Sequence, residues 1–256
     1  MRNDINDDLV SVIMPAYNSE KYIGEAIESV LNQSYKNWEL IIVNDASSDN
    51  TESIIKEYAA KNNKIVLISL TENKGVANAR NIAIQNARGR FVAFLDSDDI
   101  WANEKLAKQI SYMKENSYCF TYHNYILFNT AIGKEFGKVI KVPNRLDYNE
   151  LLKGNCTGSC LTTVIDRNFI KKIHMPNQRH EDYVCWLNIF KEYNVQAYGV
   201  NEMLGYYRVG KSSISSNKLR SAYWTWKVYR DSQKIGFLDA VFYFFNYAIK
   251  GVLKYK

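Results

Sequence analysis

Cysteine is scarce in this sequence, and its spacing argues against a disulfide framework or a structural zinc site. The four cysteines are Cys119, Cys156, Cys160 and Cys185. Cys156 and Cys160 are close together, but no second close pair completes a zinc set. We therefore expect reduced, mostly buried thiols in a cytosolic protein.

Other features are missing as well. Only three prolines interrupt the 256 residues, and no internal repeat or low-complexity stretch occurs, which is typical of one folded domain with at most a small appendage. Residues 1–8 are polar and hold no apolar run, so a disordered N-terminus without a secretory signal is predicted. No Gly-x-Gly-x-x-Gly fingerprint is present, which argues against a dinucleotide oxidoreductase.

Acidic residues are few at the C-terminal end. Residues 217–256 hold eight lysines and arginines but only Asp231 and Asp239, so this segment accounts for the whole net charge of +6 (8 − 2 = 6). The rest of the chain is near neutral, which argues against a nucleic-acid-binding body. Within the segment, residues 240–249 are uncharged and rich in aromatics. They are too few to cross a bilayer, which takes about 20 residues. The pattern predicts a basic, amphipathic helical tail on an anionic membrane surface. Packing of the same aromatics against the domain is the alternative.

Strand and helix patterns alternate through the first hundred residues. Apolar runs typical of strands lie at 9–15, 39–43, 65–70 and 91–95. Helical patterns lie between them at 21–32, from the N-cap residue types at 47–49 to about 61, and at 76–86. Strands of this length separated by helices predict an α/β fold, with a mostly parallel sheet covered on both faces. Ligands of such sheets bind at the carboxyl ends of the strands.

The most informative stretch, Asp96-Ser97-Asp98-Asp99, follows the fourth of these strands. Carboxylates are costly to bury unless they are paired or bound to a metal. Mg²⁺ typically takes one or two protein carboxylates together with substrate phosphates. The pattern therefore indicates a metal–diphosphate site. The alternative is a turn in which Asp99 or Asn103 caps a helix that begins near residue 104.

Four segments, in this order, resemble family 2 glycosyltransferases of the GT-A fold. They are residues 10–18 (VSVIMPAYN), 39–51, 73–81 and 94–99 (FLDSDD). Later, Glu181-Asp182 before Trp186-Leu187, and residues 206–208 before 213–215, are similar to the acceptor-side motifs of the family. The resemblance covers about residues 9–216 and implies a Rossmann-like central sheet. It also implies transfer of a sugar from a nucleotide diphosphate donor, usually with inversion.

The resemblance also implies roles for single residues. Asp98 would ligate Mn²⁺ or Mg²⁺, and Asp182 would be the general base, with Glu181 as a second candidate. The remaining residues would bind the donor nucleotide: Pro15, Ala16 and Tyr17 as a pocket wall, Asp45 at the nucleobase, Asp96 at the ribose, and Asn73, Gly75, Arg80, Ser97 and Arg208 around the nucleotide and diphosphate.

This sequence departs from the family pattern in three places. The second-strand motif reads Asn44-Asp45-Ala46 where relatives often have Asp-Asp-Gly. Many relatives have a histidine two residues after the arginine that corresponds to Arg208, where it can bind the metal. This sequence has none there, so metal ligation would rest on Asp98 alone. Processive polysaccharide synthases of the family carry an Arg-Trp pair. No such pair occurs in this sequence, which favours transfer of single sugars.

The combined interpretation is an inverting, non-processive glycosyltransferase of bacterial surface polysaccharide synthesis. The expected donor is a UDP-sugar and the expected acceptor is a lipid-linked saccharide. The enzyme would be cytoplasmic and peripheral on the inner face of the membrane. Residues 9–100 would form the donor half, 101–216 the acceptor half and 217–256 the tail. A catalytically inactive nucleotide-sugar-binding scaffold subunit is the rival hypothesis; a nucleotidyltransferase is disfavoured, because no glycine-rich basic loop follows the first strand. The sequence does not identify the sugar, the accepting hydroxyl or the oligomeric state.

Overall fold

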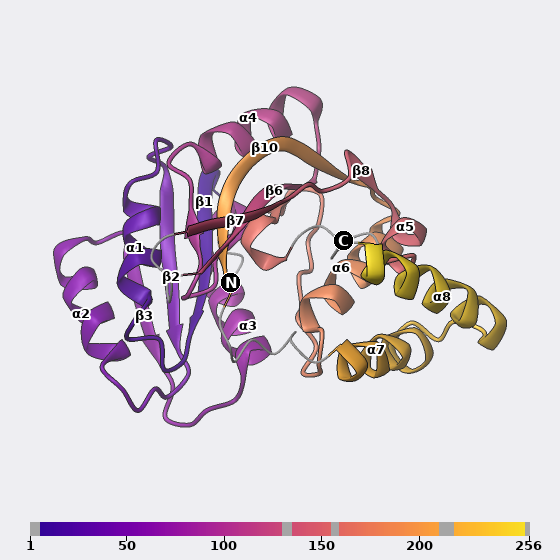
Figure 1. The fold of residues 1–256 in the computed structure, drawn as a ribbon. Coiled ribbons are helices and arrows are strands. Elements are labelled where there is room, and N and C mark those ends of the chain that lie inside the picture. Colours follow the sequence, from indigo (N-terminus) through magenta and orange to yellow (C-terminus); the bar gives the residue numbers. More distant parts are fainter. Residues whose placement is uncertain (1–5, 130–134, 155–158, 210–217, 254–256) are drawn as a thin grey trace.

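In the part of the chain that the structure describes, the strands form one ten-stranded sheet. Eight of them follow the order β3-β2-β1-β4-β9-β6-β10-β5, and of the other two, β7 pairs with β6 and β8 pairs with β10. The computed structural model describes residues 6–129, 135–154, 159–209 and 218–253 (Figure 1). The strands are β1 (Asn6–Ala16), β2 (Trp38–Asn44), β3 (Ile65–Ser69), β4 (Gly89–Phe94), β5 (Ile100–Trp101), β6 (Phe120–Asn129), β7 (Glu135–Ile140), β8 (Arg145–Leu146), β9 (Val164–Asp166) and β10 (Ala197–Arg208).

The helices cover the sheet and form one edge of the molecule. They are α1 (Ile23–Leu31), α2 (Thr51–Lys61), α3 (Val76–Asn86), α4 (Lys105–Asn116), α5 (Tyr148–Leu152), α6 (Glu181–Tyr193), α7 (Lys218–Lys227) and α8 (Phe237–Leu253). A 3₁₀ turn (η1, Cys160–Thr162) precedes β9, and a π-helical turn (η3, Val228–Ser232) joins α7 to α8. In Figure 1, α7 and α8 lie at the edge of the molecule opposite α2.

Alternate side chains of the central strands enter two separate cores. From β1, Ile13 joins the cluster formed with α3 and α6, whereas Val12 and Met14 join the cluster formed with α1 and α4. Successive side chains of a strand point to opposite faces of its sheet, so both faces of β1 are buried. The predicted sheet with helices on both faces is therefore confirmed.

The two halves of the sheet differ in strand direction. The first four strands, β1 to β4, pair only in parallel among themselves. Beyond β4 the sheet is mixed, because β9 runs antiparallel to both β4 and β6, while β6 and β10 are parallel. The carboxyl ends of β1, β2 and β4 thus meet at one rim, as expected.

Several element boundaries differ from the expectations. β1 begins at Asn6, inside the segment expected to be disordered up to residue 8, because Asn6 pairs with Gly89 and the Tyr35 hydroxyl donates to the Asp8 carbonyl. Residues 1–5 lie outside the described residues. Neither Asp99 nor Asn103 caps α4: its N-cap is Glu104, without a side-chain cap hydrogen bond.

The C-terminal tail is helical, as predicted, but one side of it packs into the domain. Val228, Tyr229 and Ala240 are buried in the core that contains α6, and the Tyr229 hydroxyl donates to the Leu152 carbonyl of α5 at 2.6 Å. None of the helices that the structure describes combines the length and apolarity needed to cross a membrane. The packing alternative is therefore confirmed for this inward side of the tail.

Candidate active site

The Asp96–Asp99 turn leaves β4 at the rim and points its carboxylates in different directions. Asp98 is exposed, whereas Asp99 is buried. One Asp99 oxygen accepts the Arg208 backbone N–H at 2.8 Å. Burial, together with the neighbouring Asp98 and Asp96, raises the pKa of Asp99 well above its usual range. Desolvation at the rim and the Asp96 carboxylate raise the pKa of Asp98 to about 6.

Arg208 holds the Asp96–Asp99 turn in place. It ends β10, and its guanidinium lies between the rings of Tyr22 and Phe128, 4.4 and 4.5 Å from their centroids. Nε donates to the Asp98 carbonyl at 2.6 Å, and a terminal nitrogen pairs with Glu25 of α1 at 2.8 Å. These contacts of the guanidinium hold the turn and α1 together, and the expected contact of Arg208 with a diphosphate stays a prediction.

Arg80 connects the two sides of the rim. It lies on α3, is buried, and donates at 2.6 Å both to Asp96 after β4 and to Glu181 at the start of α6. These partners are far apart in sequence, so one guanidinium ties a residue expected to bind the donor to the pair expected to supply the base. The Nε of Arg80 is buried without a hydrogen-bond partner among the described residues.

Asp182 and Glu181 lie in the first turn of α6, where the helix dipole favours negative charge. Desolvation and the Asp182 carboxylate raise the pKa of Glu181, although Arg80 opposes this rise. Asp182 accepts from the Tyr183 N–H at 2.7 Å, and no described residue forms a salt bridge with it. Of the two candidates, Asp182 is thus the one whose carboxylate is not already committed to a cation.

Asp45 organises the loop between β3 and α3. Its two oxygens accept the backbone N–H groups of Lys74 and Gly75, each at 2.8 Å, and the Asn73 amide donates to its carbonyl at 3.2 Å. Gly75 has φ +87°, a left-handed conformation that favours glycine. Each Asp45 oxygen retains capacity for a second hydrogen bond, but the residue is buried, and the expected nucleobase contact stays a prediction.

The remaining donor-side candidates lie at the end of β1 and beside it. Pro15 and Ala16 belong to β1, and Ala16 is buried; the Tyr17 side chain after them is 51% exposed, so its ring is available for stacking. The Ser97 hydroxyl is committed elsewhere: it is buried and lies 2.7 Å from the Ser19 hydroxyl. Ser97 therefore joins the two loops of the rim, and its expected contact with the donor stays a prediction.

The rim fits a divalent cation shared with a substrate. No group of three or more His, Cys, Asp or Glu side chains able to hold a metal alone occurs in the described ranges. However, Asp98 is an exposed carboxylate with a raised pKa beside Asp96 and Asp99, an excess of negative charge that a cation would relieve. Mg²⁺ sites of this kind are completed by phosphate oxygens.

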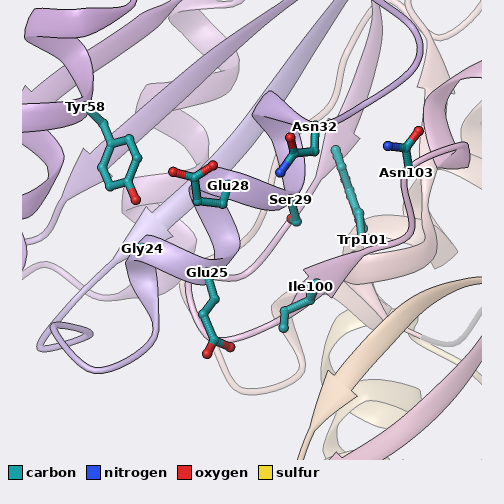
Figure 2. A pocket seen from close by; sticks show the side chains of 9 residues that line it. All are labelled: Gly24, Glu25, Glu28, Ser29, Asn32, Tyr58, Ile100, Trp101 and Asn103. Carbon is teal, nitrogen blue, oxygen red and sulfur yellow. The ribbon is translucent and has the colours of Figure 1, made fainter. Parts of the chain in front are cut away.

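A cavity of about 510 Å³ lies between α1, α2 and β5, and Glu25, which pairs with Arg208, is one of the residues that line it (Figure 2). Glu25 and Glu28 of α1 line it together with Tyr58 and Trp101. None of the residues predicted for the site lines this cavity, and its two carboxylates would repel a diphosphate. We therefore do not assign the donor to it.

One sequence match begins inside a strand instead of after one. Residues 205–212 read Gly-Tyr-Tyr-Arg-Val-Gly-Lys-Ser, which has the spacing of a P-loop. A P-loop follows a strand, whereas here residues 205–208 are themselves part of β10 and pair with β5 and β6. The match has no nucleotide-binding geometry in its described part.

Sequence reasoning missed the residues that hold the rim from behind. Glu25, Tyr22 and Ser19 contact Arg208 or Ser97 from the loop and helix after β1. In the sequence, Glu25 looks like an ordinary solvent-facing helix residue, so no local signal marked it.

The chain matches known proteins along most of its length. Residues 11–174 match the family model described as Glycosyl transferase family 2. A Bacillus subtilis (strain 168) protein that carries the name of a teichuronic acid biosynthesis glycosyltransferase, TuaG, is 44% identical over 247 residues, covering 96% of this chain and 97% of the relative.

An Escherichia coli relative is 42% identical over 251 residues, covering 98% of this chain and 96% of its own. It is named UDP-Glc:alpha-D-GlcNAc-diphosphoundecaprenol beta-1,3-glucosyltransferase WfgD. Among solved structures, the mannosyltransferase PcManGT from Pyrobaculum calidifontis, in complex with GDP-Man and Mn²⁺, superposes with a TM-score of 0.67 at 19% identity. That match covers 92% of this chain and 68% of the other, and it supports the fold.

Proposed function

The chain belongs to glycosyl transferase family 2, and from this membership we propose that it transfers glucose from UDP-glucose to a sugar carried on a polyprenyl diphosphate. The 42% identical relative is named for that donor and for an N-acetylglucosamine acceptor on diphosphoundecaprenol. The relative named for teichuronic acid biosynthesis supports a role in making a bacterial surface polysaccharide. A lipid-linked acceptor also supports a peripheral position at the cytoplasmic face of the membrane.

The observation that carries the proposal is the Arg80 bridge. By pairing with Asp96 and Glu181 at 2.6 Å each, Arg80 brings the end of β4 beside the start of α6. A sugar donor held at the Asp96–Asp98 side would then have the Asp182 carboxylate close by. Residues 9–100 supply the donor half and residues 101–216 the acceptor half in this assignment.

The proposed reaction is a single displacement at the anomeric carbon. The acceptor hydroxyl attacks, its proton passes to the Asp182 carboxylate, and the bond from the anomeric carbon to the diphosphate oxygen breaks with its electron pair leaving on UDP. Attack opposite the leaving group inverts the anomeric centre. Arg80 keeps Glu181 paired, which leaves the proton-accepting role to its neighbour Asp182.

The donor side binds and orients the nucleotide. Asp45 fixes the Lys74–Gly75 backbone and offers its remaining lone pairs to the nucleobase, beside the exposed Tyr17 ring. Asp98 would hold Mn²⁺ or Mg²⁺ together with the donor diphosphate, and the bound ion would neutralise the negative charge that develops on the departing UDP. Arg208 keeps the Asp98 backbone in place, because its Nε donates a hydrogen bond to the Asp98 carbonyl.

The test is a transfer assay with purified protein, Mn²⁺, radiolabelled UDP-glucose and synthetic N-acetylglucosamine diphospholipid. We expect one glucose to be added, and NMR of the product should show the inverted, β-configured linkage. A panel of UDP- and GDP-sugars, measured by calorimetry, identifies the donor independently. If UDP-sugars bind but none is hydrolysed or transferred, the inactive scaffold hypothesis replaces this one.

A further inference from the structure

Helix α8 carries two apolar faces, and only one of them is buried. Ala240 is buried, and Tyr243 and Phe244 pack on the core beside it. The opposite face is uncovered, with Leu238 82% and Phe245 66% exposed. At 3.6 residues per turn, the large exposed side chains fall on one side of the helix: Phe237, Leu238, Val241, Phe242, Phe245 and Ile249. We call these six residues the outward face.

The packing of the inward side fixes which way the outward face points. The Trp226 and Phe244 rings meet edge to face at 5.6 Å, and the Tyr243 hydroxyl donates to Asn149 at 2.9 Å. Gly154, at φ +82°, lies so close that an added Cβ would be 2.9 Å from the Tyr247 Cα. Because α8 is docked this closely, it cannot roll to bury its outward face without breaking the inward contacts.

The tail that carries the outward face has an excess of positive charge. In the described part of the tail, residues 218–253, six lysines and arginines stand against Asp231 and Asp239, an excess of four (6 − 2 = 4). Lys234 is exposed immediately before α8, and Lys250 lies in its last turn. A second protein would need an acidic apolar groove to match this surface, whereas an anionic bilayer offers both properties everywhere on its interface.

We propose that the outward face of α8 is a membrane-docking surface that lies flat in the headgroup region of an anionic bilayer. The helix has 17 residues, and its length suits an interfacial helix rather than a spanning one. The choice of a bilayer rests in part on the proposed function, since a polyprenyl-linked acceptor is presented there. This proposal adds to that function the surface, its orientation and its lipid charge preference.

Docking through α8 also orients the proposed base. Gln233, after the π-helical turn, donates to Asn188 of α6 at 2.8 Å and accepts from Tyr148 at 3.0 Å. These bonds connect the tail to α6 and to α5, and the first turn of α6 holds Glu181 and Asp182. A bilayer held by α8 would therefore present its lipid-linked acceptor to the same side of the molecule each time.

The experiment uses the full-length protein and co-sedimentation with two kinds of vesicle, pure phosphatidylcholine and phosphatidylcholine containing phosphatidylglycerol. The double variant Leu238→Ser/Phe245→Ser should bind the anionic vesicles on the order of 100-fold more weakly, because two large apolar side chains no longer enter the interface. Phe169→Ser is the matched control, since Phe169 is 53% exposed outside the tail, and it should bind like wild type. Wild-type binding should be at least about tenfold weaker on neutral vesicles and at high salt.

A second readout separates this proposal from the proposed function. The double variant should retain wild-type UDP-glucose binding and transfer to a short-chain, water-soluble acceptor, and lose transfer to a vesicle-borne acceptor. Wild-type vesicle binding by the double variant, or equal binding to both lipids, overturns the proposal. So does a concentration-dependent dimer in ultracentrifugation that the double variant abolishes, because the occupant would then be a second copy of this chain. Failure of UDP-glucose binding in the wild type would count against the proposed function alone.

Discussion

Replacing Arg80 by methionine tests whether one buried guanidinium holds the two sides of the rim together. Methionine keeps much of the side-chain length but removes both hydrogen bonds, to Asp96 and to Glu181, each 2.6 Å long. Three carboxylates, including Asp182, would then lie close together without their cation. Removing one partner of a buried ionic network is strongly destabilising, because the other charges stay behind uncompensated.

The size of the expected stability loss follows from the two hydrogen bonds removed and from the exposure of their acceptors. A hydrogen bond to a charged group contributes roughly 1.5–3 kcal/mol, so two give about 3–6 kcal/mol. Asp96 is 28% and Glu181 16% exposed, and solvent screening reduces the worth of such pairs. We therefore expect the free energy of unfolding to fall by about 3 kcal/mol, which corresponds to a drop of roughly 6–12 °C in Tm for a chain of this size.

The loss should depend on pH in a defined direction. The pKa of Glu181 is already raised by desolvation and by Asp182, and Arg80 opposes the rise. Without Arg80, the pKa of Glu181 rises further, and an acid whose folded pKa is raised loses stability as pH increases through that pKa. The deficit of the variant should thus be largest near pH 8 and shrink toward about pH 5, where the carboxyl groups take up protons.

Urea unfolding at both pH values, with Glu181→Gln and the double variant completing a cycle, measures the effect. Glu181→Gln should cost less stability in the Arg80→Met background than in wild type, because the two side chains act through one contact. Additive losses, or wild-type stability of Arg80→Met at pH 8, would refute the reasoning. Lost transfer with wild-type stability would instead make Arg80 a donor contact only.

Other variants address single groups of the site and the tail. Asp98→Ala should abolish Mn²⁺-dependent UDP binding and lower turnover by on the order of 10³-fold; full activity in EDTA would argue against the metal. In wild type, Mn²⁺ affinity measured by calorimetry should fall about tenfold per pH unit below a pH of about 6, because protons then compete for Asp98. Asp182→Asn should keep donor affinity while transfer falls roughly 10²- to 10⁴-fold, and a greater loss in Glu181→Gln would move the base to residue 181. Gly154→Ala should lower stability by about 2 kcal/mol or more, through its positive φ and its contact with Tyr247; an unchanged Tm would mean that α8 is loosely docked.

The donor-side elements were predictable because each depends on local signals. The helix predicted at 76–86 is α3 with the same bounds. The strand predicted at 39–43 is one residue shorter than β2 at each end, and the strand predicted at 65–70 is one residue longer than β3 at its end. Apolar periodicity sets these elements, and the parallel topology then brings their carboxyl ends to one rim. For that reason Asp45, Asp96 and Asp98 could be grouped from the sequence alone.

The contacts that hold the rim were not predictable, because they join residues distant in sequence. Nothing near Arg208 indicates that it would be clamped between Tyr22 and Phe128, or that Glu25 would pair with it. The commitment of the Ser97 hydroxyl to Ser19 is likewise a product of tertiary packing. The tail illustrates the same limit: its amphipathic pattern predicts a helix, but only the packed structure separates the inward from the outward face.

The clamp made by Arg208 has a consequence for how the protein is made. Apart from Arg208 itself, the residues expected to bind the donor precede residue 99, yet the turn that carries Asp98 is fixed by the Arg208 side chain, which follows 110 residues later. A ribosome adds about 5–20 residues per second. The Asp96–Asp99 turn of the donor half therefore lacks its contacts with Arg208 until most of the chain has been synthesised. Nascent chains halted before residue 208 should fold much of their parallel sheet but fail to retain UDP. Chimaeras that join this donor half to the acceptor half of another enzyme should also fail to retain UDP, unless that acceptor half supplies an equivalent arginine.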